Sequence, residues 1–393
     1  MVFIKKSKKK LILLIVVCIL TFSIVCVSSV FISIELRYRI KEKKIAGIES
    51  EQSQSLYYFN QLTYKEQLLF KSVKSAADLY EKQTDILPYR FGESEFQRVI
   101  KAISFDCPEL FYVNSDSFEL FCDDYKTQIK MDFLASPDKI KEMKMEMEAV
   151  SAAAVAYTND DQSEFEKSVI LHDFLVKNCT HAGKIKSSLE IPETAHTAYG
   201  ALINKLAFCD GYSAAYKILL NRCGIECIIV EGKTDVEPHL WNLVKQNNVY
   251  YHVDCTWNDP DVDFISDIFF HGYFDVSDSE IVKTHVMYDY FDLPSCDSSE
   301  NYYSLINAKV SSPEDFEQTA YIQLKNAVSR NQTYFEIYPI YTNDESNYKD
   351  SLLNAIDRIN SEFDSSVLSR SFRTFDATSD GYAVSVQIYY INQ

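Results

Sequence analysis

Apolar residues in this chain form one long run at the start and afterwards recur at helical or strand-like spacing. Residues 11–34 carry no charge. Helical spacing recurs over residues 64–80, 95–106 and 136–157, which predicts a helix in each segment. Residues 108–124 alternate as a pair of strands does, with an Asn-Ser-Asp turn in the middle.

A second group of periodic segments fills the middle of the chain. Ser163 and Glu166 form a capping-box signal for one helix. Another helix is expected over residues 207–224, with Gly224 as its stop signal. Strand-like runs follow at residues 225–233, 239–246 and 249–257. Asn247–Asn248 is typical of a hairpin turn between the last two strands.

The last eighty residues predict a small separate unit, residues 314–393, of mixed helix and strand. The expected order is a helix at 313–330, a strand at 334–342, a helix at 348–363 and a closing strand at 382–391. No residue in this unit is a candidate for catalysis.

The charge is divided unevenly between the start of the chain and the rest. The formal net charge is −18, yet residues 1–44 hold ten lysines and arginines against two glutamates. The rest of the chain, residues 45–393, which we call the body, is therefore strongly acidic. Because nucleic-acid binding depends on Lys and Arg that neutralise phosphates, we expect no nucleic-acid partner.

The apolar run 11–34 predicts an uncleaved single-pass membrane anchor. As a helix its 24 residues span about 36 Å, against a hydrocarbon core of about 30 Å. A cleaved signal peptide would have a shorter apolar region and a small-residue cleavage site. The lysines of the basic tail, residues 1–10, favour a cytoplasmic N-terminus. The prediction places the body outside the cell membrane, on a polar stalk of residues 35–55.

Cysteine usage leaves three interpretations of Cys209: a reactive thiolate, half of a disulfide or a small buried side chain. Eight cysteines lie beyond the apolar run, and an exported protein often pairs them. Setting Cys209 aside as a nucleophile leaves an odd number, so we expect few or no disulfides.

A thiol nucleophile must be ionised, so its pKa has to be lowered. A helix N-terminus and a neighbouring imidazolium both lower the pKa of a cysteine thiol. Cys209 stands at a predicted helix start. His239 lies on a strand predicted to pair with the strand that ends at Asp254. An acidic group beside the imidazole would hold its orientation and tautomer. Each residue alone is a weak signal, whereas the ordered set Cys209, His239, Asp254 predicts a catalytic triad.

The motifs around these residues resemble the transglutaminase-like superfamily in its bacterial, Firmicute-type form. The chain carries Cys209-Asp210-Gly211-Tyr212-Ser213, His239-Leu240-Trp241-Asn242 and the ending Asp254 to Pro260. The resemblance covers about residues 56–304, with "DCPELFYV" in the N-terminal part and "YFDVSDSEIVKTH" after the core. Leu240 departs from the pattern, which usually has a small residue there.

The resemblance implies an α+β fold with a papain-like core and a Cys-His-Asp site for acyl transfer. The Cys209 thiolate would attack an amide carbonyl, His239 would protonate the leaving nitrogen, and Asp254 would hold the imidazole. Oxyanion or cleft candidates are Tyr199, Trp241 and Trp257, although each is also suited to packing. The thioester would pass to an amine, giving a cross-link, or to water, giving hydrolysis.

Other histidines and acidic residues fit structural roles better than metal binding. His172, His181 and His196, with Cys179, match no zinc spacing. The acidic residues from Asp259 to Asp263 lack the glycine and closing glutamate of a calcium loop. We therefore expect no metal and no cofactor.

Two partners are expected. One is a protein or peptide substrate, and the other is the membrane, which residues 11–34 would contact. An alternative is a catalytically silent binding or scaffold module at the cell surface. The predicted organisation is a tail at 1–10, an anchor at 11–34, a stalk at 35–55, an N-terminal α+β region at 56–157, a transglutaminase-like core at 158–304 and a C-terminal unit at 314–393.

Overall fold

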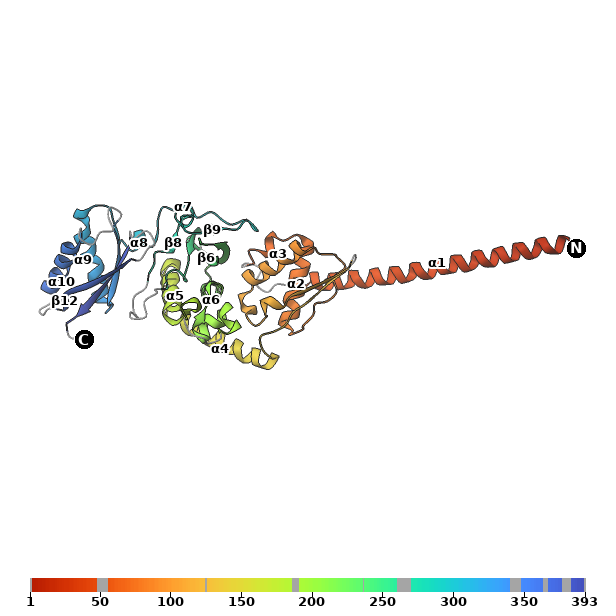
Figure 1. Cartoon of the computed structure of the whole chain (residues 1–393), viewed down its shortest axis with the longest axis horizontal. Coiled ribbons are helices and arrows are strands. Elements are labelled where there is room, and N and C mark those ends of the chain that lie inside the picture. The colour runs from red at the N-terminus through yellow and green to blue at the C-terminus, as the bar shows by residue number, and fades with distance from the viewer. Residues whose placement is uncertain are drawn as a thin grey trace. The chain divides into compact units, whose positions relative to one another are not determined.

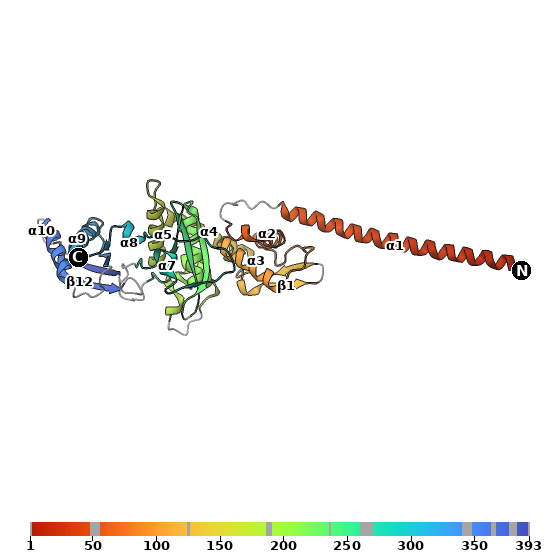
Figure 2. The same cartoon turned by 90° about the horizontal axis from the view of Figure 1, so that it is seen from above.

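A computed structural model of the chain describes two compact units. The described residues are 2–47, 56–123, 126–185, 191–235, 237–259, 270–339, 348–362, 367–376 and 383–391. The smaller unit comprises Met1–Ser53, Leu62–Ile100 and Ser115–Asp132, and the larger unit Gln54–Gln61, Lys101–Asn114 and Phe133–Gln393. Figures 1 and 2 show the chain in two views, coloured from red at the N-terminus to blue at the C-terminus.

The smaller unit combines helices with a short hairpin. Its elements are α1 (Val2–Ala46), α2 (Tyr64–Asp78), the first part of α3 (Glu93–Asp106), β1 (Glu119–Cys122) and β2 (Thr127–Lys130). β1 and β2 pair antiparallel. α2 begins with a capping box in which Thr63 and Glu66 satisfy each other's backbone N–H groups, which explains why the helix starts there.

The N-terminal apolar run lies inside α1, which continues without interruption through the lysine-rich residues on both sides. Within the described part of the chain, no helix combines the length and the apolar character of a membrane span. The anchor predicted at residues 11–34 is therefore not found.

The core of the larger unit is a five-stranded antiparallel sheet in the order β8-β7-β6-β5-β9. Its strands are β5 (Cys227–Lys233), β6 (Pro238–Gln246), β7 (Val249–Val253), β8 (Phe274–Val276) and β9 (Val286–Met287). Asn247 and Asn248, both with positive φ (51° and 66°), form the turn between β6 and β7. This confirms the predicted hairpin, because asparagine tolerates the left-handed conformation such turns require.

Helices α4 (Pro137–Val155), α5 (Glu164–Asn178) and α6 (Cys209–Arg222) accompany this sheet. α6 packs directly on β5 and β6, and α5 packs on α6; the helices appear in yellow and green in Figure 1. Ser163 and Glu166 form the predicted capping box at the start of α5. Gly224, with a φ of 74°, lies just beyond the end of α6 and supplies its predicted stop.

Shorter elements connect the main ones. They are the 3₁₀ turns Phe59–Gln61, Pro108–Leu110, Ser115–Ser117, Ala182–Lys184 and Glu193–His196, the π-helical turn Gly200–Asn204, β3 (Thr180–His181), β4 (Leu206–Ala207), α7 (Asp278–Ile281) and α8 (Tyr302–Leu305). The strand pair predicted over 108–124 is wrong in its first half. Pro108 has no N–H for a ladder and starts a 3₁₀ turn instead, while only Glu119–Cys122 forms a strand.

The C-terminal part of the larger unit is a second sheet with two helices. Its elements are β10 (Lys309–Val310), α9 (Pro313–Ser329), β11 (Tyr334–Pro339), α10 (Lys349–Glu362), β12 (Leu368–Asp376) and β13 (Val384–Tyr390). The strand order is β10-β11-β13-β12, and only the first pair is parallel. Its own apolar core includes Phe316, Ile337 and Ile359. We call residues 309–391 the C-terminal sheet domain.

Candidate active site

Cys209 is the first residue of α6 and is partly exposed. Phe208 precedes the helix, and its carbonyl accepts the Tyr212 N–H. The Cys209 N–H has no hydrogen-bond partner among the residues that the structure describes, as is usual in the first turn of a helix. A free N–H beside the sulfur is the arrangement that an oxyanion hole requires.

Gly211 allows the start of α6 to lie against a neighbouring backbone. A Cβ at this position would lie 2.8 Å from the Ala195 carbonyl oxygen and 2.9 Å from that of Thr197. The Phe208 N–H donates to the same Ala195 carbonyl. Any larger residue at 211 would therefore displace the turn that presents Cys209.

His239 and Asp254 lie together beside the start of α6. His239 is near the start of β6, Asp254 follows the end of β7, and the His239 Nε2 lies 2.6 Å from the Asp254 Oδ2. The Cys209 side chain lies close enough to the same imidazole to contribute to the raised pKa of His239. The structure thus brings the three predicted triad residues together in the order Cys-His-Asp.

The second oxygen of Asp254 is bound by the turn that follows β7. Its Oδ1 accepts the backbone N–H groups of Thr256 and Trp257, at 2.9 and 3.1 Å. The carboxylate is thereby fixed in direction as well as in position. Burial would raise the pKa of Asp254, but the charges and hydrogen bonds of His239 and His285 hold it well below its usual range.

His285 is a fourth member of the site that the sequence did not single out. Its Nε2 lies 3.1 Å from the Asp254 Oδ2, and its Nδ1 lies 2.8 Å from the Thr284 hydroxyl. Two imidazoles therefore share one carboxylate oxygen. The one available signal was its place in the segment "YFDVSDSEIVKTH", which lies far from the triad in sequence.

The electrostatics of the site favour a protonated His239. Burial lowers the pKa of this imidazole, but the charge and hydrogen bond of Asp254 and the contact with Cys209 outweigh burial and raise the pKa to about 10. The His239 side chain is 4% exposed. A charged imidazolium held by the Asp254 carboxylate is suited to donate a proton to a leaving group.

The three cleft candidates occupy different positions. Trp257 is partly exposed, and its ring centroid lies 6.1 Å from that of His239. Trp241 is buried and stacks on His239, with its indole N–H donated to His252. The Tyr199 hydroxyl donates to Glu146, and its ring stacks on Phe111. Burial and this carboxylate raise the pKa of Tyr199 to about 12.

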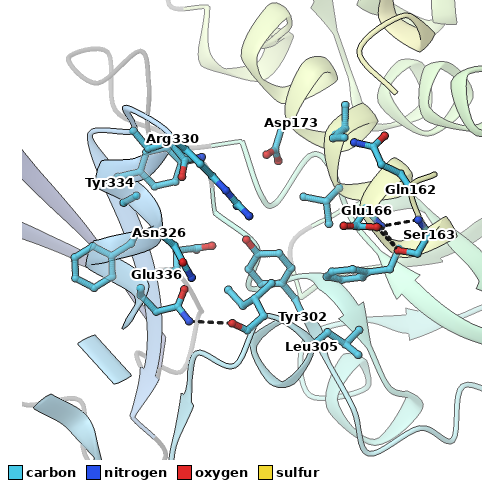
Figure 3. A pocket seen from close by; sticks show the side chains of 18 residues that line it. Gln162, Ser163, Glu166, Asp173, Tyr302, Leu305, Asn326, Arg330, Tyr334 and Glu336 are labelled. Atoms are coloured by element: carbon cyan, nitrogen blue, oxygen red, sulfur yellow. Dashed lines mark hydrogen bonds between the residues drawn. The ribbon is translucent and has the colours of Figure 1, made fainter. Parts of the chain in front are cut away.

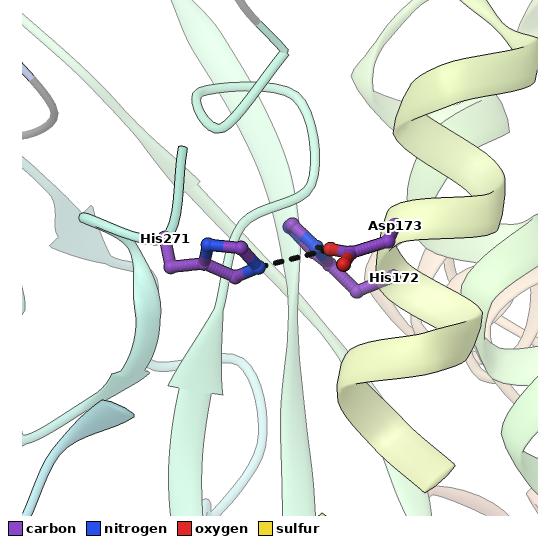
Figure 4. A group of neighbouring side chains, drawn as sticks. All are labelled: His172, Asp173 and His271. Carbon is purple, nitrogen blue, oxygen red and sulfur yellow. Dashed lines mark hydrogen bonds and ion pairs between the residues drawn. The ribbon is translucent and has the colours of Figure 1, made fainter. Parts of the chain in front are cut away.

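The other histidines considered from the sequence are spread over separate contacts. His196 is exposed and pairs with Asp210 at 2.7 Å, with its ring stacked on Phe208. The His181 ring lies edge-on against Phe208. His172 belongs to a second cluster, which we call the bridging cluster: His172, Asp173, His271 and Glu336. Figure 4 shows the first three of these residues.

The bridging cluster has the residue types of a metal site, but its side chains are joined to one another by hydrogen bonds. The Asn258 side-chain oxygen accepts the Tyr273 N–H, so its amide nitrogen donates to His172 Nε2. The proton of neutral His172 therefore lies on Nδ1, the atom that faces Asp173. A metal at Nδ1 would displace this proton, so the hydrogen bonds of the group favour a proton at Nδ1 although its ligand atoms lie near one another.

Comparisons with known proteins find only distant structural likeness. No protein-family model matches the chain, and no curated protein is similar to it. Among solved structures, a TGase is 12% identical over 46% of this chain and 52% of its own, with a TM-score of 0.27. A proposed cysteine protease of Cytophaga hutchinsonii is 10% identical over 36% and 61%, with a TM-score of 0.21.

A proposed protease of Parabacteroides distasonis is 12% identical over 37% of this chain and 39% of its own, with a TM-score of 0.20. The chain spans less than two thirds of each of these structures. Likeness at this level carries no argument about activity, which rests instead on the geometry of Cys209, His239 and Asp254.

Proposed function

We propose that the protein is a cysteine-dependent acyl-transfer enzyme acting on amide bonds of protein or peptide through a thioester. The observation that carries the proposal is the grouping of Cys209, at the start of α6, with His239 and its hydrogen-bonded partner Asp254. The free Cys209 N–H beside the sulfur supports it further.

The steps follow from these contacts. The Cys209 sulfur attacks the amide carbonyl carbon, and the Cys209 N–H stabilises the resulting oxyanion. The C–N bond breaks as His239 gives its proton to the leaving amine, and a thioester remains on Cys209. A second amine or water then attacks the thioester, returns its own proton to His239 and frees the thiolate.

The direct test compares the full chain with Cys209→Ala. Alkylation by iodoacetamide is followed peptide by peptide by mass spectrometry, so that the nine other cysteines serve as internal references. We expect Cys209 to react at least about tenfold faster than Cys122, an exposed thiol, because a neighbouring imidazolium activates it. Reaction no faster than Cys122 would favour the silent binding module instead.

Transfer and hydrolysis are separated by the fate of the thioester. The enzyme is incubated with glutamine-containing and other peptides and a labelled primary amine, and products are identified by mass spectrometry. Isopeptide or labelled products indicate transfer, and free acids or shorter peptides indicate hydrolysis. Absence of both with the wild type, or equal products with Cys209→Ala, would contradict the proposal.

The substrate and the location are proposed more coarsely. We infer that the acyl donor is an amide of an extracellular protein or of cell-wall peptide, as the acidic body predicted to lie outside the cell suggests. This placement stays a prediction. Fractionation of cells that express the full chain, with protease added outside, measures which side the body faces.

A further inference from the structure

Among the residues by which the C-terminal sheet domain contacts the rest of the larger unit, Glu336 is a charged residue that is itself buried. Glu336 lies on β11 and is 3% exposed. Its carboxylate accepts hydrogen bonds from both the ring Nδ1 and the backbone N–H of His271. A buried carboxylate costs free energy unless it is paired, so this contact is specific rather than incidental.

His271 continues the connection from β11 to α5. Its Nε2 lies 2.9 Å from the Asp173 Oδ1 (Figure 4). With Glu336 at Nδ1, the ring is held between two carboxylates. Both ring nitrogens donate, which requires the imidazolium form. Tyr302 stacks on this ring at 4.0 Å between centroids and covers it.

From Asp173 the connection runs to the turn that carries the triad carboxylate. The same Asp173 Oδ1 accepts from His172 Nδ1 at 2.9 Å, and His172 Nε2 accepts from the Asn258 amide at 3.0 Å. Asn258 donates its backbone N–H to the Asp254 carbonyl. Every link is a direct hydrogen bond between described atoms.

Asn258 also fixes the turn from its other side. Its side-chain oxygen accepts the Tyr273 N–H at 2.9 Å, while the Asp254 N–H donates to the Tyr273 carbonyl at 2.8 Å. The turn at Asp254 is thus held by Asn258, whose amide orientation matches a His172 proton on Nδ1.

We propose that Glu336 is a positioning residue for the Cys209 site, acting on the turn that carries Asp254 through His271, Asp173, His172 and Asn258. This inference rests on the function proposed above. It gives the C-terminal sheet domain a role in the reaction, although none of its residues touches the triad in the described part of the chain.

We call the hydrogen-bonded residues from Glu336 through His271, Asp173 and His172 to Asn258 the relay. A cavity of about 730 Å³ lies beside it (Figure 3). Asp173, on the α5 side, and Glu336, on the C-terminal sheet domain, both line it, as does Arg330. No triad residue lines this cavity. Solvent can therefore reach the edge of the relay at Asp173, whose side chain is 26% exposed, without passing through the Cys209 site.

The test is a double-mutant cycle in the full chain with Glu336→Gln and His172→Phe. Glu336→Gln keeps the size of the side chain, His172→Phe keeps a planar ring, and each breaks the chain of hydrogen bonds at a different point. We expect Glu336→Gln to slow Cys209 alkylation about 3- to 30-fold, the range of mutations that alter coupling between sites. In the His172→Phe background the same change should have no further effect.

Glu362→Gln is the matched control. Glu362 lies in the same domain and accepts hydrogen bonds from Tyr321 and Lys325, but it is outside the relay. It should leave the alkylation rate within twofold of the wild type. Equal slowing by Glu336→Gln in both backgrounds, or slowing no greater than with Glu362→Gln, overturns the proposal. If His172→Phe does not fold, Asp173→Asn takes its place.

A spectroscopic readout separates this inference from the proposed function. Histidine-labelled protein has only seven imidazoles, so the ring-proton resonance of His239 hydrogen-bonded to Asp254 can be assigned by mutation. If the proposed function fails because Cys209 is unreactive, a shift of this resonance in Glu336→Gln but not in Glu362→Gln still supports the relay. An unchanged resonance overturns it.

Discussion

The larger unit contains two buried groups of histidine and carboxylate that look alike and differ in what they face. At Asp254 two imidazoles share one carboxylate, and His239 also contacts Cys209. At His271 the ratio is reversed, because one imidazole lies between the carboxylates of Asp173 and Glu336.

In both groups a histidine is held in its charged form. Burial lowers the pKa of each ring, and neighbouring carboxylates outweigh burial to raise the pKa of His239 and of His271 to about 10. The difference lies in the groups that surround each charged imidazole. His239 has the Cys209 sulfur near it, whereas His271 has carboxylates on both sides. On the function proposed above, the same chemistry serves reaction in one place and connection in the other.

The largest expected effect is that of Asp254→Asn on the reactive site. The amide keeps the shape of the side chain but removes the charge that holds His239 in the right tautomer. We expect amide turnover to fall about 10²- to 10⁴-fold. Steady-state turnover measures this, and a loss below tenfold would mean that the carboxylate does not orient the imidazole.

His271→Ala should instead act mainly on stability. It leaves the Asp173 and Glu336 carboxylates facing each other without the cation, and breaking a buried pair costs about 3–5 kcal/mol. Urea unfolding measures the loss. His196→Ala is the control, because its pair with Asp210 is exposed and should matter by less than about 1 kcal/mol. Equal losses would contradict the bridging role.

The two raised pKa values predict that stability falls with alkali. His239 and His271 bind protons more tightly in the folded chain, so their contribution is complete below the unfolded pKa of about 6.5 and is lost as the pH rises to about 10. Each ring contributes a slope of at most about 1.4 kcal/mol per pH unit. Between about pH 6.5 and 10, the free energy of unfolding should fall more steeply with pH for the wild type than for His271→Gln. The two slopes should differ by at most about 1.4 kcal/mol per pH unit.

The smallest expected effect is that of His285→Ala, which removes one of the two imidazoles on Asp254. The lost hydrogen bond to a charged group corresponds to about 1.5–3 kcal/mol, or roughly tenfold or more in Cys209 alkylation. His285→Gln keeps an N–H donor and should recover part of the rate. Equal rates for the two variants would argue against a positioning role.

Local patterns in the sequence were enough to predict the helix and strands that carry Cys209, His239 and Asp254. The start of α6 at Cys209, its stop at Gly224 and the turn at Asn247–Asn248 each depend on a few adjacent residues. The pairing of β6 with β7 then brings His239 near Asp254. These features are set by short-range backbone preferences and were predicted.

The features that the sequence did not predict depend on distant residues or on weak patterns. His271 is 98 residues from Asp173 and 65 from Glu336, so no periodicity joins them. His285 reaches Asp254 from 31 residues away. The edge strand β12 was missed because the polar residues of Leu368–Asp376 lack the alternation of a half-buried strand.

The membership of Glu336 in the relay has a consequence for the order of events during synthesis. Glu336 lies on β11, which is paired with β13 (Val384–Tyr390). A ribosome that adds roughly 5–20 residues per second needs roughly 9 to 35 s to pass from Cys209 to β13. On the inference drawn above, the nascent thiol emerges well before its catalytic turn is fixed. Each new copy would therefore pass through an interval in which its nucleophile exists but is not yet aligned.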